Sequence, residues 1–344
     1  MMDTALDIGG LVGYRYRAAD YYEVGREKIR EYARAVQDFH PSHWSEDAAR
    51  ECGYLGLLAP TTFTSIVAMQ ADAVLLGNVL TGYDTFVHTD QVFEMHKPIV
   101  AGDRLFIDVE LTAVRRIAGR DLLTVTNTFT DQSERVVQRT HTTLVGITSD
   151  DADVAIGDAI GRVVMSGLDV AAPAESARYA EHVTTQQDLQ TVPDSHLSRT
   201  RLPHTAIRFQ DIAIGDELPA RTVQVTRGDL VNYAGVAGDV NPIHWHEQVA
   251  TLIGLPDVVA HGMLSMGLGA GFVTDWLGDP GAILRYGARL SNYAAVDALA
   301  AGEVEFGGRI KSIDAETRTA TVVLVAKSAG RKIFGLATID VRFS

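Results

Sequence analysis

The chain carries two copies of one sequence pattern, separated by a constant offset of 201 residues. Residues 22–44 (YEVGREKIREYARAVQDFHPSHW) align without a gap on residues 223–245 (VQVTRGDLVNYAGVAGDVNPIHW). The same offset relates several pairs of infrequent residues: Tyr32 and Tyr233, Asp38 and Asp239, Pro41 and Pro242, His43 and His244, Trp44 and Trp245, and Ala59 and Ala260. Chance does not place so many uncommon residues in one register, so the sequence predicts two copies of one fold.

Each copy predicts the same order of elements. A helix with apolar residues at helical spacing (25–36 and 227–237) precedes a turn, a short helix and a longer apolar helix (62–77 and 262–277). Alternating, β-branched segments then predict strands at 85–96, 103–116, 121–131 and 135–147, and at 282–294, 302–313, 318–327 and 331–343. One buried helix followed by antiparallel strands indicates an α+β architecture in which each sheet wraps around its helix.

The two copies divide the chain into three parts. We predict an N-terminal domain at 1–149, a linker at 150–204 and a C-terminal domain at 205–344. The middle segment changes character, because it is polar and carries many Asp, Ser, Gln and Pro residues. We interpret it as a long crossover, partly ordered across the surface and without chemistry of its own.

Charge and cysteine content narrow the range of functions. The formal net charge of −14 argues against binding to nucleic acid or to an anionic membrane surface. A single cysteine, Cys52, excludes an internal disulfide and fits a reducing cytoplasm. The N-terminus lacks a basic region and no apolar run reaches spanning length, so we expect a cytoplasmic protein without membrane insertion.

The stretch 238–271 carries the candidate chemistry. Asp239 and His244 lie five residues apart in a turn held by Asn241 and Pro242, so a carboxylate and an imidazole can converge on one proton. An apolar helix then begins near Gly262, where free backbone N–H groups can approach a carbonyl oxygen. An acid/base pair and an oxyanion site are the two parts needed to move a proton next to a carbonyl.

Other interpretations of these residues stay open. Asp-x-Asn-Pro is a common turn former, and a lone Asp/His pair is more often structural than catalytic. His244 and His246 form an H-x-H pair, but neighbours on a short helix point apart, so we predict no metal site. Gly-rich phosphate loops are also absent from the pattern, and we expect no cofactor.

The combination of these motifs resembles the MaoC-type (R)-specific enoyl hydratase and dehydratase family of hot-dog folds. The second copy (YAGVAGDVNPIHW, VVAHGMLSMGLGAGFVTDWLGDPGA and GGRIKSID) is similar to the B-type catalytic subunit of (3R)-hydroxyacyl-ACP dehydratases. The first copy (VGYRYRAADYYEVGREKIREYA, GYLGLLAPTTF and KPIVAGDRL) is similar to their non-catalytic A-type partner. The resemblance implies a fused double hot-dog chain with two sheets, each wrapped around a central helix.

The resemblance also implies roles for single residues. Asp239 and His244 become the catalytic pair, Asn241 orders the turn, and the Gly262 N–H holds the thioester carbonyl. Asp38 and His43 form a possible degenerate second site. Its other positions depart from the motif: His40 replaces Asn241, and Pro60 and Thr61 replace the AHGM helix start. We expect that site to be silent, with the first copy's helix lining an acyl-chain tunnel whose wall candidates are Phe63, Ile66 and Val67.

These features favour a (3R)-hydroxyacyl-thioester dehydratase or (R)-specific enoyl hydratase acting on acyl-ACP or acyl-CoA. A hot-dog thioesterase and a non-catalytic acyl-thioester-binding protein are the alternatives. An acyl carrier protein would need a local basic patch on this acidic chain, with Arg309, Lys311, Arg331 and Lys332 as candidates. The loop 289–306 departs from the family's Pro-Gly-Asp type turn at the substrate entrance. Both a monomer, as an internal pseudo-dimer, and a homodimer fit the repeat.

Overall fold

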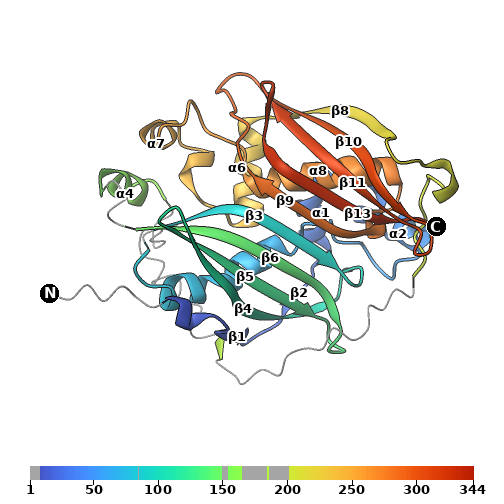
Figure 1. The fold of residues 1–344 in the computed structure, drawn as a ribbon, viewed down its shortest axis with the longest axis horizontal. Coiled ribbons are helices and arrows are strands. Elements are labelled where there is room, and N and C mark those ends of the chain that lie inside the picture. Colours follow the sequence, from blue (N-terminus) through green and yellow to red (C-terminus); the bar gives the residue numbers. More distant parts are fainter. Residues whose placement is uncertain (1–7, 84, 149–153, 165–183, 186–200) are drawn as a thin grey trace.

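The predicted α+β double hot-dog architecture is confirmed. The computed structural model describes residues 8–83, 85–148, 154–164, 184–185 and 201–344. Figure 1 shows two curved antiparallel sheets side by side, each packed against helices on its inner face. The inner faces hold most of the buried apolar side chains, and these form one continuous core across both halves.

The bounds of the elements follow the repeat. The first half contains η1 (Ile8–Leu11), β1 (Arg15–Ala18), β2 (Tyr22–Glu23), α1 (Arg26–Ala35), η2 (Pro41–His43), α2 (Glu46–Glu51), α3 (Ser65–Val74), the π-helix η3 (Leu75–Val79), β3 (Thr85–Met95), β4 (Arg104–Ile117), β5 (Arg120–Thr130) and β6 (Val136–Ile147). The second half contains η4 (Phe209–Asp211), β8 (Glu217–Val225), α6 (Arg227–Ala237), η5 (Pro242–His244), α7 (Glu247–Leu252), α8 (Gly262–Leu277), η6 (Pro280–Ala282), β9 (Ile283–Leu290), β10 (Gly302–Asp314), β11 (Thr319–Ser328), β12 (Arg331–Lys332) and β13 (Phe334–Arg342).

The two curved sheets are joined edge to edge into one continuous sheet. Its strand order is β7-β1-β4-β5-β6-β3-β9-β13-β11-β10-β8, where β7 is Thr184–Thr185. Strand β3 pairs antiparallel with β9 at the junction, where Val92 lies opposite Gly287. Helices α1 and α6 also pack together on the inner side. The two halves are therefore in contact both along a strand edge and between their first long helices.

Several bounds differ from the sequence prediction. The helix expected at 62–77 begins at Ser65 and continues as a π-helix to Val79, and the strand expected at 282–294 ends at Leu290. Strands β1, β2 and β8 precede the helices and were not predicted. They are short or mostly polar on one face, so their apolar periodicity is weak.

The predicted linker lies mostly outside the described residues, so its role stays a prediction. Within it, α4 (Val154–Gly161) packs against α7 and β7 (Thr184–Thr185) pairs with β1. Its end is fixed at a buried Asp279, which accepts hydrogen bonds from the Arg201 guanidinium at 2.6 Å and the His204 N–H at 2.7 Å. Tyr54 of the first half donates to the same carboxylate. Among the described helices, none combines the length and apolar character needed to span a bilayer.

Helix α8 uses glycine to bring the halves close together. A Cβ at Gly267 would lie 2.5 Å from Cγ1 of Val36 in the first half. Gly269 instead faces the second half's own sheet, where a Cβ would lie 2.8 Å from the Tyr286 hydroxyl of β9. At Gly271 the nearest atom is Asp38 Cγ, 3.7 Å away. The glycine-rich face, which weakens a helix in isolation, is therefore the surface on which the first half packs.

Gly267→Ala should destabilise the protein by about 1–3 kcal/mol, because the added methyl group overpacks against Val36. Gly235→Ala is the matched control, since Gly235 lies in α6 with no atom within 4 Å of its Cβ position. Alanine there should raise the free energy of unfolding by up to about 1 kcal/mol, as helix propensity predicts. Urea unfolding of both variants gives the comparison; equal effects would contradict the close packing.

Candidate active site

The turn after α6 presents Asp239. Gly238 ends the helix in the left-handed conformation with φ of 77°, which reverses the chain. The Asp239 Oδ1 then accepts a hydrogen bond from the Asn241 N–H at 3.3 Å, and the Asn241 side chain accepts one from the Ile243 N–H at 3.3 Å. Pro242 opens the short helix η5, whose last residue is His244. The turn thus fixes both candidate residues on one rigid segment.

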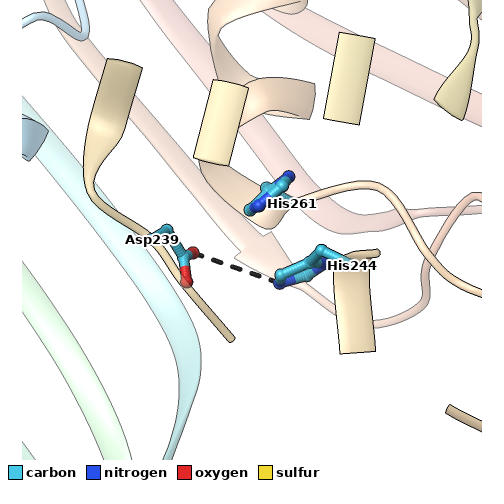
Figure 2. Close-up of side chains that lie close together, drawn as sticks. All are labelled: Asp239, His244 and His261. Carbon is cyan, nitrogen blue, oxygen red and sulfur yellow. Dashed lines mark ion pairs between the residues drawn. The ribbon is translucent and has the colours of Figure 1, made fainter. Parts of the chain in front are cut away.

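The His244 ring has a defined tautomer. Its Nδ1 lies 2.7 Å from the Val259 carbonyl oxygen, which can only accept, so Nδ1 carries a proton. Nε2 faces Asp239 Oδ2 at 4.0 Å, as the dashed line in Figure 2 shows. The His244 side chain is 9% exposed and that of Asp239 is 32% exposed. The pair therefore lies at the edge of the core, with its carboxylate open to solvent.

Burial lowers the pKa of His244 below its ordinary value, against the opposing pull of Asp239 and of the Val259 carbonyl. A histidine with a lowered pKa is neutral at pH 7 and keeps a lone pair on its second nitrogen. Nε2 of His244 is therefore available to accept a proton.

Helix α8 begins at Gly262, as predicted, three residues after the Val259 carbonyl that holds His244. The first N–H groups of a helix have no partner within it and form a site for negative charge. A Cβ at Gly262 would lie 2.6 Å from Leu290 Cδ1, so a side chain at this position would collide with Leu290 and glycine fits without a shift. The loop after Leu290 runs alongside, since the Ala260 N–H donates to the Ala294 carbonyl at 2.8 Å.

His261 joins this site and was missed in the sequence analysis. Its ring stacks on that of His244 with centroids 3.7 Å apart and 27° between the planes, and it is fully buried. Figure 2 shows the three side chains together. The available signal was the offset of 201, because His261 aligns with Pro60 and is thus a difference between otherwise similar copies.

The candidate ligand atoms of Asp239, His244 and His261 all lie within 4.8 Å of one another. Exposed carboxylates commonly lie near such groups without holding an ion, so this spacing does not by itself make a metal site. The absence of a metal site stays a prediction.

The first copy keeps the same turn with different surroundings. His43 Nδ1 lies 2.6 Å from the Leu58 carbonyl oxygen, and its Nε2 lies 3.3 Å from Asp38 Oδ2. The exposed fractions of the two side chains are 0% and 2%. His40 replaces Asn241, and its ring accepts a hydrogen bond from the Ser42 N–H, so it caps η2 as Asn241 caps η5.

What the first copy lacks is the helix start. The position equivalent to Gly262 is Thr61, but α3 begins only at Ser65, after a turn that contains Pro60. A cleft nearby is lined by residues that include Pro60, Thr61 and Arg342, and neither Asp38 nor His43 lines it. The dyad of the first copy is therefore sealed and has no helix N-terminus beside it.

The pKa values of His43 and His244 are shifted in opposite directions. Burial acts to lower the pKa of His43, but the Asp38 carboxylate at 3.3 Å and the Leu58 carbonyl outweigh it, and the pKa of His43 is raised. Burial likewise acts to raise the pKa of Asp38, but His43 and the His40 N–H lower it. Asp38 and His43 therefore form a buried ion pair, whereas His244 is neutral.

The remaining predicted residues divide into two groups. Phe63, Ile66 and Val67 are almost fully buried in the core, which a helix core alone explains, so the tunnel stays a prediction. The four candidate cations do not form one patch. Arg309 pairs with Val323 in the middle of β11, whereas Arg331 pairs with Ser328 at its end, and five residues of strand span roughly 17 Å.

Comparison with known proteins identifies the family. The model of the FAS1-like dehydratase domain region matches residues 10–140, and that of the MaoC like domain matches residues 208–296. A solved structure described as a MaoC-like dehydratase is 52% identical, covers 98% of this chain and 100% of its own, and superposes with a TM-score of 0.89. This chain belongs to the MaoC-like dehydratase family.

Two further relatives extend the comparison. This chain is 43% identical to a UPF0336 protein of Mycobacterium tuberculosis over 145 residues, which are 42% of this chain and 92% of the relative. A conserved hypothetical protein of Mycobacterium tuberculosis with a double hotdog fold superposes with a TM-score of 0.61 at 14% identity, covering 96% of each chain. That last likeness concerns the fold alone.

The buried Asp38–His43 pair should make the stability of the folded chain depend on pH. The raised pKa of His43 means that its contribution is fully present below its ordinary value of 6.5 and lost as pH rises through the folded-state value. The lowered pKa of Asp38 means that its contribution is present above its ordinary value of 3.8 and lost as pH falls through the folded-state value. The pair should therefore stabilise most between these two values.

His43→Gln should lower the free energy of unfolding by about 3 kcal/mol near pH 5, because it leaves Asp38 buried without its partner. The difference from wild type should shrink at alkaline pH, once the pH has risen through the raised folded-state pKa of His43. His141→Gln is the matched control, since His141 pairs with Glu94 at 3.5 Å with both side chains about one-third exposed. Urea unfolding at both pH values gives the result; a pH-independent loss at His43 would exclude a charged pair.

Proposed function

We propose that the chain is a (3R)-hydroxyacyl-thioester dehydratase that also catalyses the reverse (R)-specific hydration of enoyl thioesters. The observation that carries this proposal is the lone pair on His244 Nε2, which faces Asp239 at 4.0 Å close to the start of α8. A neutral base, a carboxylate and free helix N–H groups together serve the removal of a proton next to a thioester carbonyl.

The dehydration follows from these positions. The thioester oxygen accepts a hydrogen bond from the Gly262 N–H, which makes the C2 proton more acidic. His244 Nε2 takes this proton, the electrons form the C2–C3 double bond, and the C3–O bond breaks. The imidazolium returns the proton to the departing hydroxyl, so that water leaves. Asp239 stabilises the imidazolium and accepts a hydrogen bond from the 3-hydroxyl; hydration runs the same steps backwards.

The position of Met69 suggests where the acyl chain of a bound substrate would lie. The Met69 methyl group of α3 lies 3.9 Å from the Cβ position of Gly238, next to Asp239. Met69 is 40% exposed, although it lies on the central helix of the first half. A substrate held at Asp239 would therefore extend its acyl chain along α3, and the first domain would serve as the acyl-binding half.

Replacing the second dyad should abolish activity and replacing the first should not. Asp239→Asn and His244→Ala should each lower kcat at least about 10²-fold, the usual loss for a general acid/base group. Asp38→Asn/His43→Gln should keep the kcat of the folded fraction, because that pair is sealed. The assay follows crotonyl-thioester hydration by loss of enoyl absorbance, with free thiol measured in parallel. Equal losses in both pairs would mean two working sites, and thiol release without enoyl loss would mean a thioesterase.

Substitutions in the two separated groups of basic residues test whether the substrate is carried by an acyl carrier protein or by CoA. Lys332 lies two residues before Phe334, which pairs with the Leu290 that covers Gly262, so Arg331 and Lys332 flank the proposed entrance. If the carrier is an acyl carrier protein, Arg331→Glu should raise KM for acyl-ACP about fivefold, as loss of a rim charge slows association. KM for acyl-CoA should change less. Lys311→Glu, at the far end of the sheet, is the matched control; the same effect at Lys311 would remove local docking from the proposal.

A further inference from the structure

His261 shields one face of the His244 ring. The two rings are stacked at 3.7 Å, and Tyr233 of α6 covers the other side of His261 with centroids 4.8 Å apart. Neither ring nitrogen of His261 meets hydrogen-bond geometry with any described residue. Burial lowers the pKa of His261 to about 2, with a further contribution from His244. His261 is therefore a neutral ring at every working pH.

We propose that His261 is a positioning residue that holds His244 as a neutral base with Nε2 directed at Asp239. The inference rests on the proposed function, because it assigns the residue that makes the dyad ready to accept a proton. Two contacts fix the His244 ring. The Val259 carbonyl sets its tautomer through Nδ1, and the stacked His261 ring sets its plane and excludes water from one face.

The first copy shows what the dyad becomes without this ring. At an offset of 201 the equivalent of His261 is Pro60, and the nearest ring to His43 is His40, edge-on at 5.9 Å. There the carboxylate approaches to 3.3 Å and the histidine is held as the charged partner of an ion pair. In the second copy the separation is 4.0 Å and the histidine is neutral. The same motif is therefore a base in one copy and a structural pair in the other.

The identity of the ring has a physical reason. A phenyl ring would stack equally well, but its negative π-face attracts a cation and would favour protonated His244. The neutral His261 imidazole carries no charge and acts by covering one face of the His244 ring. Neither of its buried nitrogens has good hydrogen-bond geometry to a described residue, a cost in free energy that packing alone would not retain.

The titratable groups around His244 come from four elements. Asp239 lies in the turn after α6, Tyr233 lies on α6 itself, and His261 lies at the start of α8. His88 of β3, from the first half, interacts electrostatically with Asp239. Asp239 and the Val259 carbonyl favour the protonated form of His244, and burial opposes both. Removing the stacked ring relieves part of that burial while Asp239 and Val259 remain.

The test measures the titration of His244 by NMR in the substrate-free protein and the pH dependence of kcat/KM in the hydration assay. In His261→Ala the midpoint for His244 should rise by about one pH unit, because burial of the charged form is relieved while Asp239 remains. The acid limb of kcat/KM should shift with it, and KM should change little. In His261→Phe plateau kcat should stay within about threefold of wild type, with a midpoint between the other two.

Each outcome decides the proposal. An unchanged His244 midpoint in His261→Ala would overturn it, whatever the activity. Loss of activity in His261→Phe equal to that in His261→Ala, with no shift in either profile, would also overturn it and indicate direct contact of a ring nitrogen with substrate. His246→Ala controls for removal of a nearby histidine outside the cluster. Since the NMR titration needs no substrate, a shifted midpoint in an inactive protein would separate failure of the proposed function from failure of this inference.

Discussion

The pairing of β3 with β9 is the constraint on which the rest of the structure depends. It joins two antiparallel sheets edge to edge, so neither half leaves that strand edge open to other chains. It also fixes which surfaces meet across the junction. The turn of each half then lies against the central helix of the other, as shown by Asp38 beside Gly271 and by Met69 beside Gly238. A site built from one turn therefore depends on both halves.

This arrangement explains how one motif acquires two electrostatic states. Both turns direct a histidine Nδ1 at a backbone carbonyl and its Nε2 at a carboxylate. The difference comes from what surrounds them. The glycine face of α8 allows the first half to pack closely, which seals Asp38 and shortens its distance to His43. On the other side α3 carries Met69 and leaves Asp239 about one-third exposed. Packing of the helices therefore acts together with the stacked His261 ring to distinguish the neutral His244 from the buried ion pair of His43.

Much of this was predictable because the repeat carries it. The constant offset predicted two equivalent folds, and the apolar, small-residue run after Ala260-His261 predicted the beginning of α8 at Gly262. The stacking of His261 on His244 was not predictable, since it joins residues 17 apart through a turn whose geometry the pattern does not encode. The separation of Lys311 from Arg331 depends on strand register and on a bulge after Ile310, which a list of charged residues does not contain. The sequence pattern therefore predicts the helices and strands, whereas strand register and ring stacking become known only from the structure.

Fusion of the two copies into one chain allows equivalent positions to carry different residues. A symmetric homodimer must place the same residue at both equivalent positions, so a ring such as His261 would appear at both sites or at neither. Here His261 stands in one copy and Pro60 in the other, and each dyad has a separate environment. The connection is anchored where the halves meet, because Asp279 binds Tyr54 of the first half and Arg201 at the end of the linker. A single buried carboxylate thus joins all three parts of the chain.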